Sequence, residues 1–204
     1  MLRGLIDRFL RKLSPTAPPE LSVLKLDLPR SWRGQYPDVP EPDSDLSVQL
    51  IAARWRCNDI YGEDMRGIAA DLLEAGFDSP SLRRLAGEIA TCSADVEELV
   101  AKVIREFGLP YPMPEEQAQL IFARQLAREV IASRRLPWSA AYELECAMWG
   151  KYPKNEDLAS IFALNDEWKW EGEAQRYVPV GTDELIGVLA RLGSMSDAEI
   201  FSVR

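Results

Sequence analysis

The chain has 204 residues, of which 47% are hydrophobic, so it is long enough to form one domain around a hydrophobic core. Its 33 acidic and 24 basic residues give a net charge of −9, which repels nucleic-acid phosphates and favours basic partners. The complete absence of histidine excludes Ser-His and Cys-His nucleophiles, histidine general bases and most catalytic zinc sites.

Cysteine usage and hydropathy predict a soluble cytoplasmic protein. Cys57, Cys92 and Cys146 are far apart and odd in number, unlike the ligands of a zinc motif or the pairs of a disulfide framework. We therefore expect each of them to be a small buried side chain in a reducing compartment. No apolar run approaches the roughly 18 residues that cross a bilayer, and the charged start "MLRGLIDRFLRKLS" is unlike a secretory signal.

Residues 1–13 predict a basic amphipathic helix. Apolar residues recur at helical spacing from Leu2 to Leu13, accompanied by four basic residues and one acidic residue. The rest of the chain, with 20 basic and 32 acidic residues, has the opposite charge. Two roles remain open: the apolar stripe packs on the core or on another subunit, or the helix binds an anionic membrane surface.

Residues 14–43 predict an extended arm or linker, because seven of the 14 prolines fall there and proline breaks helices. Within the arm, "VLKLDL" (residues 23–28) alternates apolar and polar side chains like a short strand. Trp32 and Tyr36 anchor the arm to its own body or to another protein. We favour its own body, because exposed aromatic side chains reduce solubility.

Residues 44–204 predict a single compact all-α domain. Helices are expected over 44–58 and 62–75, from Pro80 through Ile89 after the N-cap Ser79, from Ser93 to Phe107, from Pro114 to Arg134, and over 139–149. Further helices follow the N-caps Asn155 and Thr182, and the capping box of Ser196 and Glu199 begins a short last one; Gly76, Gly108 and Gly193 act as stops. About eight or nine helices without alternating strands indicate an all-α fold.

Acidic residues cluster in sequence around one predicted helix, at Asp59, Glu63, Asp64, Asp71 and Glu74. A dimetal site in a helical bundle normally adds a Glu-x-x-His pair, which a chain without histidine cannot supply. Carboxylates at the start of a helix also stabilise its dipole, so these residues have an ordinary role. We predict no metal site here.

Nucleotide and hydrolase motifs are missing from the sequence as well. It contains no G-x-x-x-x-G-K-[ST], G-x-G-x-x-G or G-x-S-x-G pattern. The basic pairs Arg83-Arg84 and Arg134-Arg135 are interpreted as solvated surface charges on an acidic protein. The sequence therefore predicts no catalytic residue, no cofactor and no direct binding of nucleic acid.

The stretch "ALNDEWKWEGEA" (residues 163–174) places two tryptophans among carboxylates. If it is helical, Trp168 and Trp170 lie about 200° apart around the axis and cannot share one buried face. If it is extended, both rings point the same way. Residues 139–173 hold eight acidic and three basic residues, and tryptophan is common at interface hot spots. The predicted partner-binding patch is Asp166, Glu167, Trp168, Trp170, Glu171 and Glu173.

Two segments resemble small uncharacterised all-helical proteins of bacteria. They are "IAADLLEAGFDSPSLRRLAGE" (Ile68 to Glu88) and "IFALNDEW" (Ile161 to Trp168). Proteins of this kind are often immunity-like partners of polymorphic toxins, so the resemblance implies a helical fold and a toxin as partner. It covers about thirty residues and transfers no catalytic residue.

Three functions follow as hypotheses, and the oligomeric state stays open. The leading one is a non-catalytic protein that binds a basic partner through its acidic surface, such as an immunity protein that neutralises a nuclease toxin. The alternative is a membrane-surface adaptor or scaffold held by residues 1–13. The third is an enzyme that uses acidic residues without histidine, which requires a deep pocket of convergent carboxylates with shifted pKa values.

Overall fold

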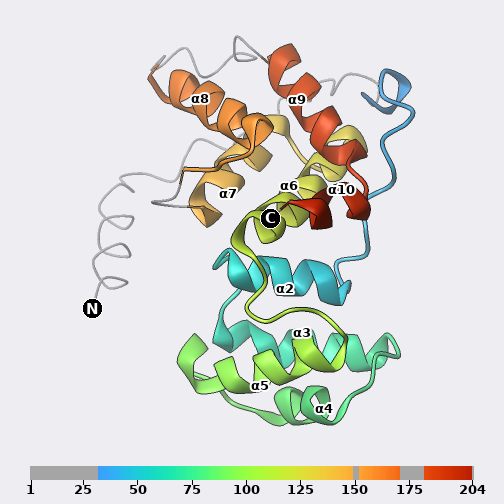
Figure 1. Cartoon of the computed structure of the whole chain (residues 1–204), viewed down its shortest axis with the longest axis vertical. Coiled ribbons are helices and arrows are strands. Elements are labelled where there is room, and N and C mark those ends of the chain that lie inside the picture. The colour runs from blue at the N-terminus through green and yellow to red at the C-terminus, as the bar shows by residue number, and fades with distance from the viewer. Residues whose placement is uncertain (1–31, 149–151, 171–181, 204) are drawn as a thin grey trace, which may run out of the picture. The chain divides into compact units, whose positions relative to one another are not determined.

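The computed structural model describes residues 32–148, 152–170 and 182–203, with only the backbone described for 167–170. These residues form nine α-helices and one 3-10 turn and contain no strand, which confirms the all-α prediction (Figure 1). The predictions for residues 1–31, namely the basic helix, most of the arm and the strand at 23–28, lie outside the described residues. None of the described helices is both long enough and apolar enough to cross a bilayer.

Three consecutive helices pack against one another and are called the three-helix group below (Figure 1). They are α3 (Gly62–Glu74), α4 (Pro80–Gly87) and α5 (Ser93–Glu106). Local signals set their limits: Ser79 accepts a hydrogen bond from the backbone N–H of Leu82 at the start of α4. Gly76, which follows α3, has a φ of 90°, and Gly108, which follows α5, has a φ of 78°. Both glycines act as the predicted stops, because other residues rarely adopt such values.

The other helices surround α6, in which fourteen of 17 residues are buried. Helices α2, α7, α9 and α10 all contact α6, while α8 contacts α7 and α9. The bounds are α2 (Val48–Arg56), α6 (Glu115–Ile131), α7 (Pro137–Ala147), α8 (Glu156–Trp170), α9 (Thr182–Ser194) and α10 (Asp197–Ser202). As predicted, Asn155 accepts hydrogen bonds at the start of α8, and Ser196 and Glu199 form a capping box at the start of α10.

Several predicted boundaries were wrong by a few residues. Helix α2 begins at Val48 rather than near Ser44, because the hydroxyl of Ser47 accepts the N–H of Leu50 as the N-cap. Helix α6 ends at Ile131, since Ser133 turns the chain with a φ of 58°. Helix α4 ends at Gly87, which leaves Ile89 outside it and 78% exposed rather than on an inner stripe.

Three further helix boundaries also differ from those predicted from the sequence. Pro137 is the first residue of α7 and not merely the end of α6, because proline is well suited to the first helical position. Thr182 is the first helical residue of α9 and accepts the indole N–H of Trp138 at 3.1 Å. Gly193 lies inside α9 rather than after it, where an added Cβ would lie 2.9 Å from the side chain of Val39.

Helices α3 and α5 meet at their first residues. Gly62 donates its backbone N–H to the hydroxyl of Ser93 at 3.1 Å. A Cβ atom added to Gly62 would lie 2.3 Å from the carbonyl oxygen of Cys92 and 2.8 Å from Cα of Ser93. Glycine is therefore required at this position by the close approach of two backbones.

The aromatic residues of the arm confirm one expectation, and the cysteines correct another. Trp32, in the 3-10 turn η1 (Trp32–Gly34), and Tyr36 are partly buried against the core, as favoured from the sequence. Cys57 is buried as expected, but Cys92 and Cys146 are exposed. The prediction that each cysteine is buried was wrong for these two because they lie at the N-cap of α5 and on the solvent side of α7.

Candidate functional site

The predicted patch begins on the last turns of α8, and the structure selects the helical alternative up to Trp170. Asp166 is exposed, Glu167, Trp168 and Trp170 belong to the helix, and Glu171 and Glu173 lie outside the described residues. Helix α8 is fixed to α7 by Asn165, which is fully buried and donates its side-chain amide to the carboxylate of Glu145. The part of the patch up to Trp170 is therefore carried on a packed helix rather than on an extended segment.

Helical register separates the two tryptophan positions. Position 168 follows the buried Ile161 by seven residues, whereas position 170 follows the exposed Ala163 by seven residues. Two positions in a helix that are two residues apart lie about 200° apart around its axis. The register therefore assigns position 170, not position 168, to the same side of α8 as Ala163.

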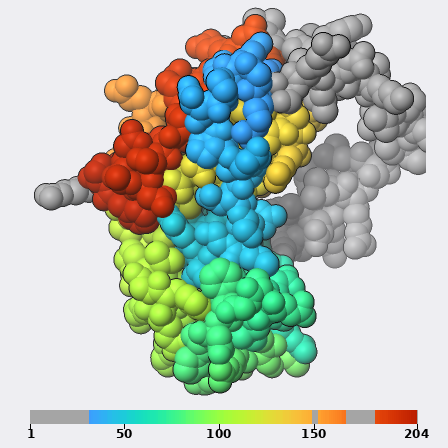
Figure 2. All heavy atoms as spheres, turned by 90° about the vertical axis from the view of Figure 1, so that its right-hand side faces the viewer, coloured from blue at the N-terminus to red at the C-terminus, as the bar shows by residue number. Residues whose placement is uncertain are grey.

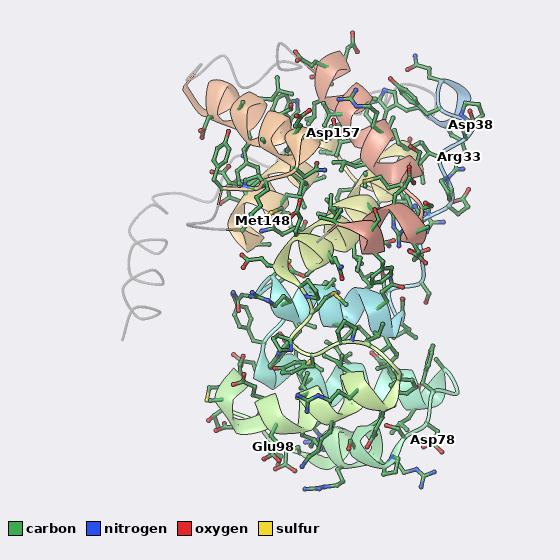
Figure 3. The ribbon with its side chains drawn as sticks, in the orientation of Figure 1. Arg33, Asp38, Asp78, Glu98, Met148 and Asp157 are labelled. Carbon is green, nitrogen blue, oxygen red and sulfur yellow. The ribbon has the colours of Figure 1, made fainter. Side chains whose placement is uncertain are left out.

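A second acidic surface was missed by the sequence analysis. Residues 61–107 contain ten acidic and five basic residues, and all ten acidic side chains are exposed. In Figure 3, Asp78 and Glu98 lie in the three-helix group, well away from Asp157 on α8. The signal was spread over 47 residues in small groups, so no single stretch stood out as strongly acidic.

The described residues as a whole are strongly negative. They comprise 28 acidic and 15 basic residues, a net charge of −13, compared with −9 for the whole chain. Several of the basic side chains are engaged in ion pairs on the inside of the fold, including Arg124, Arg128 and Arg135. With a net charge of −9 for the whole chain, the protein is expected to attract basic partners and to repel acidic ones.

A cleft of about 560 Å3 is lined by the segment before α2, by α2 and α6, and by the chain from Arg134 to Glu143 in α7, and we call it the Glu143 cleft. Charged residues line most of it, above an apolar floor that includes Leu50, Phe122 and Leu126. The charged residues of the lining are Asp43, Asp45, Arg54, Glu129, Arg134, Arg135 and Glu143. No motif in the sequence predicted this grouping.

Ion pairs organise the Glu143 cleft. Arg135 is bound to Glu129 at 2.6 Å and also to Glu143, while Arg54 is bound to Asp59 at 2.6 Å. The prediction that Arg135 is a solvated surface charge was wrong, because its side chain is 29% exposed and joins two carboxylates. Arg134 next to it is exposed, as predicted.

Burial raises the pKa of Glu143 above that of an ordinary glutamate. The neighbouring charge of Arg135 lowers the pKa, whereas the charges of Asp59 and Glu129 raise it further. A group whose pKa is raised on folding stabilises the fold at acid pH, and that contribution is lost as the pH rises through the folded-state pKa. Ionisation of Glu143 therefore opposes folding slightly near neutral pH.

Carbon-13 NMR titration of the side-chain carboxyl groups tests this electrostatic arrangement. We expect Glu143 to titrate above the ordinary glutamate range and Asp59→Asn to lower its pKa, because the substitution removes one negative neighbour. Asp71→Asn, on the exposed side of α3, serves as the control and should leave Glu143 unchanged. An ordinary pKa for Glu143 in the unmodified protein would contradict this description of the cleft.

A second cavity of about 440 Å3 lies on the other side of Asp43 and Ser44, and we call it the Arg124 cavity. Figure 2 shows the chain before α2 (blue) on the surface. The C-terminal helices (red) lie on one side of it, and residues around the end of α6 (yellow) lie on the other. The cavity is lined by Asp43, Ser44, Ser47, Gln49, Arg124, Arg128, Ser196 and Asp197.

Arg124 and Arg128 hold the end of α9 against α6. Arg128 donates to the carbonyl oxygen of Gly193 at 2.9 Å, and Arg124 donates to that of Met195 at 3.3 Å. The last carbonyls of a helix have no partner within the helix and carry partial negative charge, so arginine is well suited to this place. Each arginine also pairs with a carboxylate: Arg128 with Asp43 at 3.0 Å, and Arg124 with Asp197 at 2.7 Å.

Among the described residues, no group of three or more acidic residues or cysteines is arranged to hold a metal ion. In comparisons with known proteins, no protein-family model, curated protein or solved structure matches this chain. The description of its sites therefore depends on the geometry given above.

Proposed function

We propose that this chain is a non-catalytic protein that binds a basic protein partner, and that it acts as an immunity protein against a basic bacterial toxin such as a nuclease. The observation that carries the proposal is the net charge of −9, with 33 acidic and 24 basic residues. A nuclease needs a positive surface to bind phosphates, and opposite charges accelerate the association of two proteins. The resemblance of residues 68–88 and 161–168 to immunity-like proteins supports the same class of partner.

The C-terminal end of α8 is proposed as the centre of the contact. It carries Asp166 in an exposed position, together with a tryptophan position on each side of the helix. A tryptophan ring removes a large apolar area from water and keeps a donor for a hydrogen bond, and surrounding carboxylates select a basic partner. Of the predicted patch, the proposed contact residues are Asp166, Glu167, Trp170, Glu171 and Glu173, whereas the helical register assigns Trp168 to the side of the buried Ile161.

The test uses the purified chain and the protein encoded by the adjacent upstream gene, which is the proposed toxin. We expect a complex whose association rate falls at least tenfold when the salt is raised from about 0.01 M to 1 M, because salt screens the steering field. Inhibition of the toxin's activity should follow complex formation. No complex with that protein, or an association rate that is independent of salt, would refute the proposal.

Matched substitutions locate the contact. By helical register, we expect Trp170→Ala to weaken binding by about 2 kcal/mol or more while leaving the fold intact, as hot-spot tryptophans do. Trp168→Ala, on the register of buried Ile161, is expected to lower the free energy of unfolding instead. Calorimetric binding and urea unfolding of both variants separate the two effects. If Trp170→Ala binds like the unmodified protein, the patch is not the contact.

Charge reversal distinguishes the two acidic surfaces. Asp166→Lys on α8 and Glu97→Lys on α5 change the net charge equally, and both positions are exposed. We expect Asp166→Lys to slow association more than Glu97→Lys, because steering is strongest for charges near the contact. The reverse order would move the proposed contact to the three-helix group.

Membrane attachment through residues 1–13 is the alternative, and the charge of the body opposes it. A negative body is repelled by the anionic lipids that would attract a basic helix. Flotation with vesicles containing phosphatidylserine, with and without residues 1–13, tests it directly. Flotation that depends on residues 1–13 would favour the adaptor role over the immunity role.

A further inference from the structure

The Arg124 cavity has more hydrogen-bond donors than its own acceptors use. Arg124 and Arg128 both line it, with side chains that are only 5% and 8% exposed. Nε of Arg124 is fully buried and has no hydrogen-bond partner among the described residues. A buried arginine donor without an acceptor is costly, so the hydrogen bonding of Arg124 is incomplete within the fold.

Two hydroxyl groups add to this donor surface. The oxygen of Ser44 accepts the backbone N–H of Leu46, and the oxygen of Ser47 accepts that of Leu50. Each hydroxyl uses its oxygen as an acceptor in these bonds, so its proton can still be donated. Both serines line the cavity beside the arginines.

The two guanidinium groups lie close enough to repel each other. Burial lowers the pKa of Arg128, and the charge of Arg124 lowers it further, against the opposing effects of Asp43 and Asp197. The two aspartates therefore do not fully compensate the cost of burying two positive charges side by side. An additional negative charge in the cavity would reduce this cost.

The acidic side chains of the cavity are its most exposed members. The side chain of Asp197 is 61% exposed and that of Asp43 is 43% exposed, whereas both arginines are buried. Asp43 is also fixed through its backbone, which exchanges hydrogen bonds with the side chain of Gln125 at 2.8 and 3.1 Å. Because the side chain of Asp197 is 61% exposed, its carboxylate can be hydrated when it leaves Arg124, although this breaks their 2.7 Å ion pair.

We propose that the Arg124 cavity is a binding site for a small oxyanion of the phosphate or sulfate type. The anion accepts hydrogen bonds from the guanidinium groups of Arg124 and Arg128 and from the hydroxyls of Ser44 and Ser47, and it takes the place of the carboxylate of Asp197 on Arg124. Arginine is the preferred partner of such anions because its planar fork presents several donors at fixed geometry. This site is independent of the proposed binding of a basic protein.

The experiment follows the arginine Nε–H signals of the full chain by proton–nitrogen NMR during titration with sodium phosphate. Sodium chloride at equal ionic strength is the reference, and sodium acetate distinguishes a tetrahedral oxyanion from a carboxylate. We expect the signals of Arg124 and Arg128 to shift saturably with phosphate, weakly with acetate and not with chloride. Equal shifts with phosphate and chloride would mean screening only and would overturn the proposal.

Substitutions of exposed residues provide the second arm of the test, because both arginines are buried and replacing either of them is expected to destabilise the fold. Asp197→Asn should tighten phosphate binding on the order of tenfold, since it removes the competing negative charge. Asp71→Asn, with the same change of charge on distant α3, should have no effect. Ser44→Ala should weaken binding by removing a donor. If Asp197→Asn binds phosphate no more tightly than Asp71→Asn, the two arginines serve only to hold α9 and α10.

Discussion

Replacing Gly62 by alanine is expected to lower the free energy of unfolding by about 3 kcal/mol or more, at the upper end of the usual cost of overpacking. The added Cβ would lie 2.3 Å from the carbonyl oxygen of Cys92 and 2.6 Å from its carbonyl carbon. These atoms belong to the backbone at the start of α5 and cannot rotate away as a side chain would. The overlap can be relieved only if α3 and α5 separate, which also breaks the hydrogen bond between Gly62 and Ser93.

Gly67→Ala in the same helix is the matched control. No atom outside the helix lies within 4 Å of the Cβ position at Gly67, and the residue is exposed in the middle of α3. Alanine there should raise stability by about 0.5 to 1 kcal/mol, because glycine is the poorer helix former. Urea unfolding followed by circular dichroism measures both changes. If Gly62→Ala is as stable as the unmodified protein, the start of α5 does not lie against α3.

Replacing Arg128 by methionine is expected to cost about 3 kcal/mol, the lower end of the range for removing one partner of a buried ion pair. The substitution leaves the carbonyl of Gly193 without its donor and Asp43 without its closest charge partner. We use the lower end because Asp43 is partly exposed and water can hydrate it. The loss should appear as a lower midpoint of urea unfolding with an unchanged slope.

Arg191→Met provides the comparison. Arg191 pairs with Asp157 at 2.7 Å, a shorter contact than the 3.0 Å between Arg128 and Asp43, but its side chain is 61% exposed. Exposed ion pairs contribute about 0 to 1 kcal/mol, so we expect a loss below 1 kcal/mol. The expected difference in unfolding free energy between the two variants therefore follows from the burial of the arginine side chain and not from the length of its ion pair. Equal losses in the two variants would show that the Arg128 pair has no special role.

The parts of the fold that the sequence predicted well depend on neighbours in the chain. Ser79 and Pro80 begin α4, Gly76 follows α3, and Ser196 with Glu199 begins α10, all as expected. Each of these signals acts within one turn of helix, so its meaning changes little with the tertiary fold. The error at Ile89 arose because an apolar residue in helical register was assigned to α4, although the helix ends two residues earlier.

The two cavities could not be predicted, because their walls come from distant parts of the chain. Asp43, Arg124 and Asp197 meet in one of them although about 150 residues separate the first from the last. Arg134 and Arg135 show the same limit on a small scale. They are adjacent in sequence, but only Arg135 turns inward to join Glu129 and Glu143. Sequence spacing predicts which residues share a helix face, but it does not predict which residues from other parts of the chain pack against that face.

The buried polar side chains of α6 also affect which part of the chain folds first during synthesis. Gln117, Arg124 and Arg128 are buried and donate to carbonyl groups of Val203, Met195 and Gly193, which lie 65 to 86 residues further along. Until those residues leave the ribosome, the central helix has polar groups that only water can satisfy, and water must be displaced for the core to close. We therefore expect the three-helix group to acquire protection from proteases early on the nascent chain, and the part built around α6 to acquire it only after residues 193–203 have emerged from the ribosome.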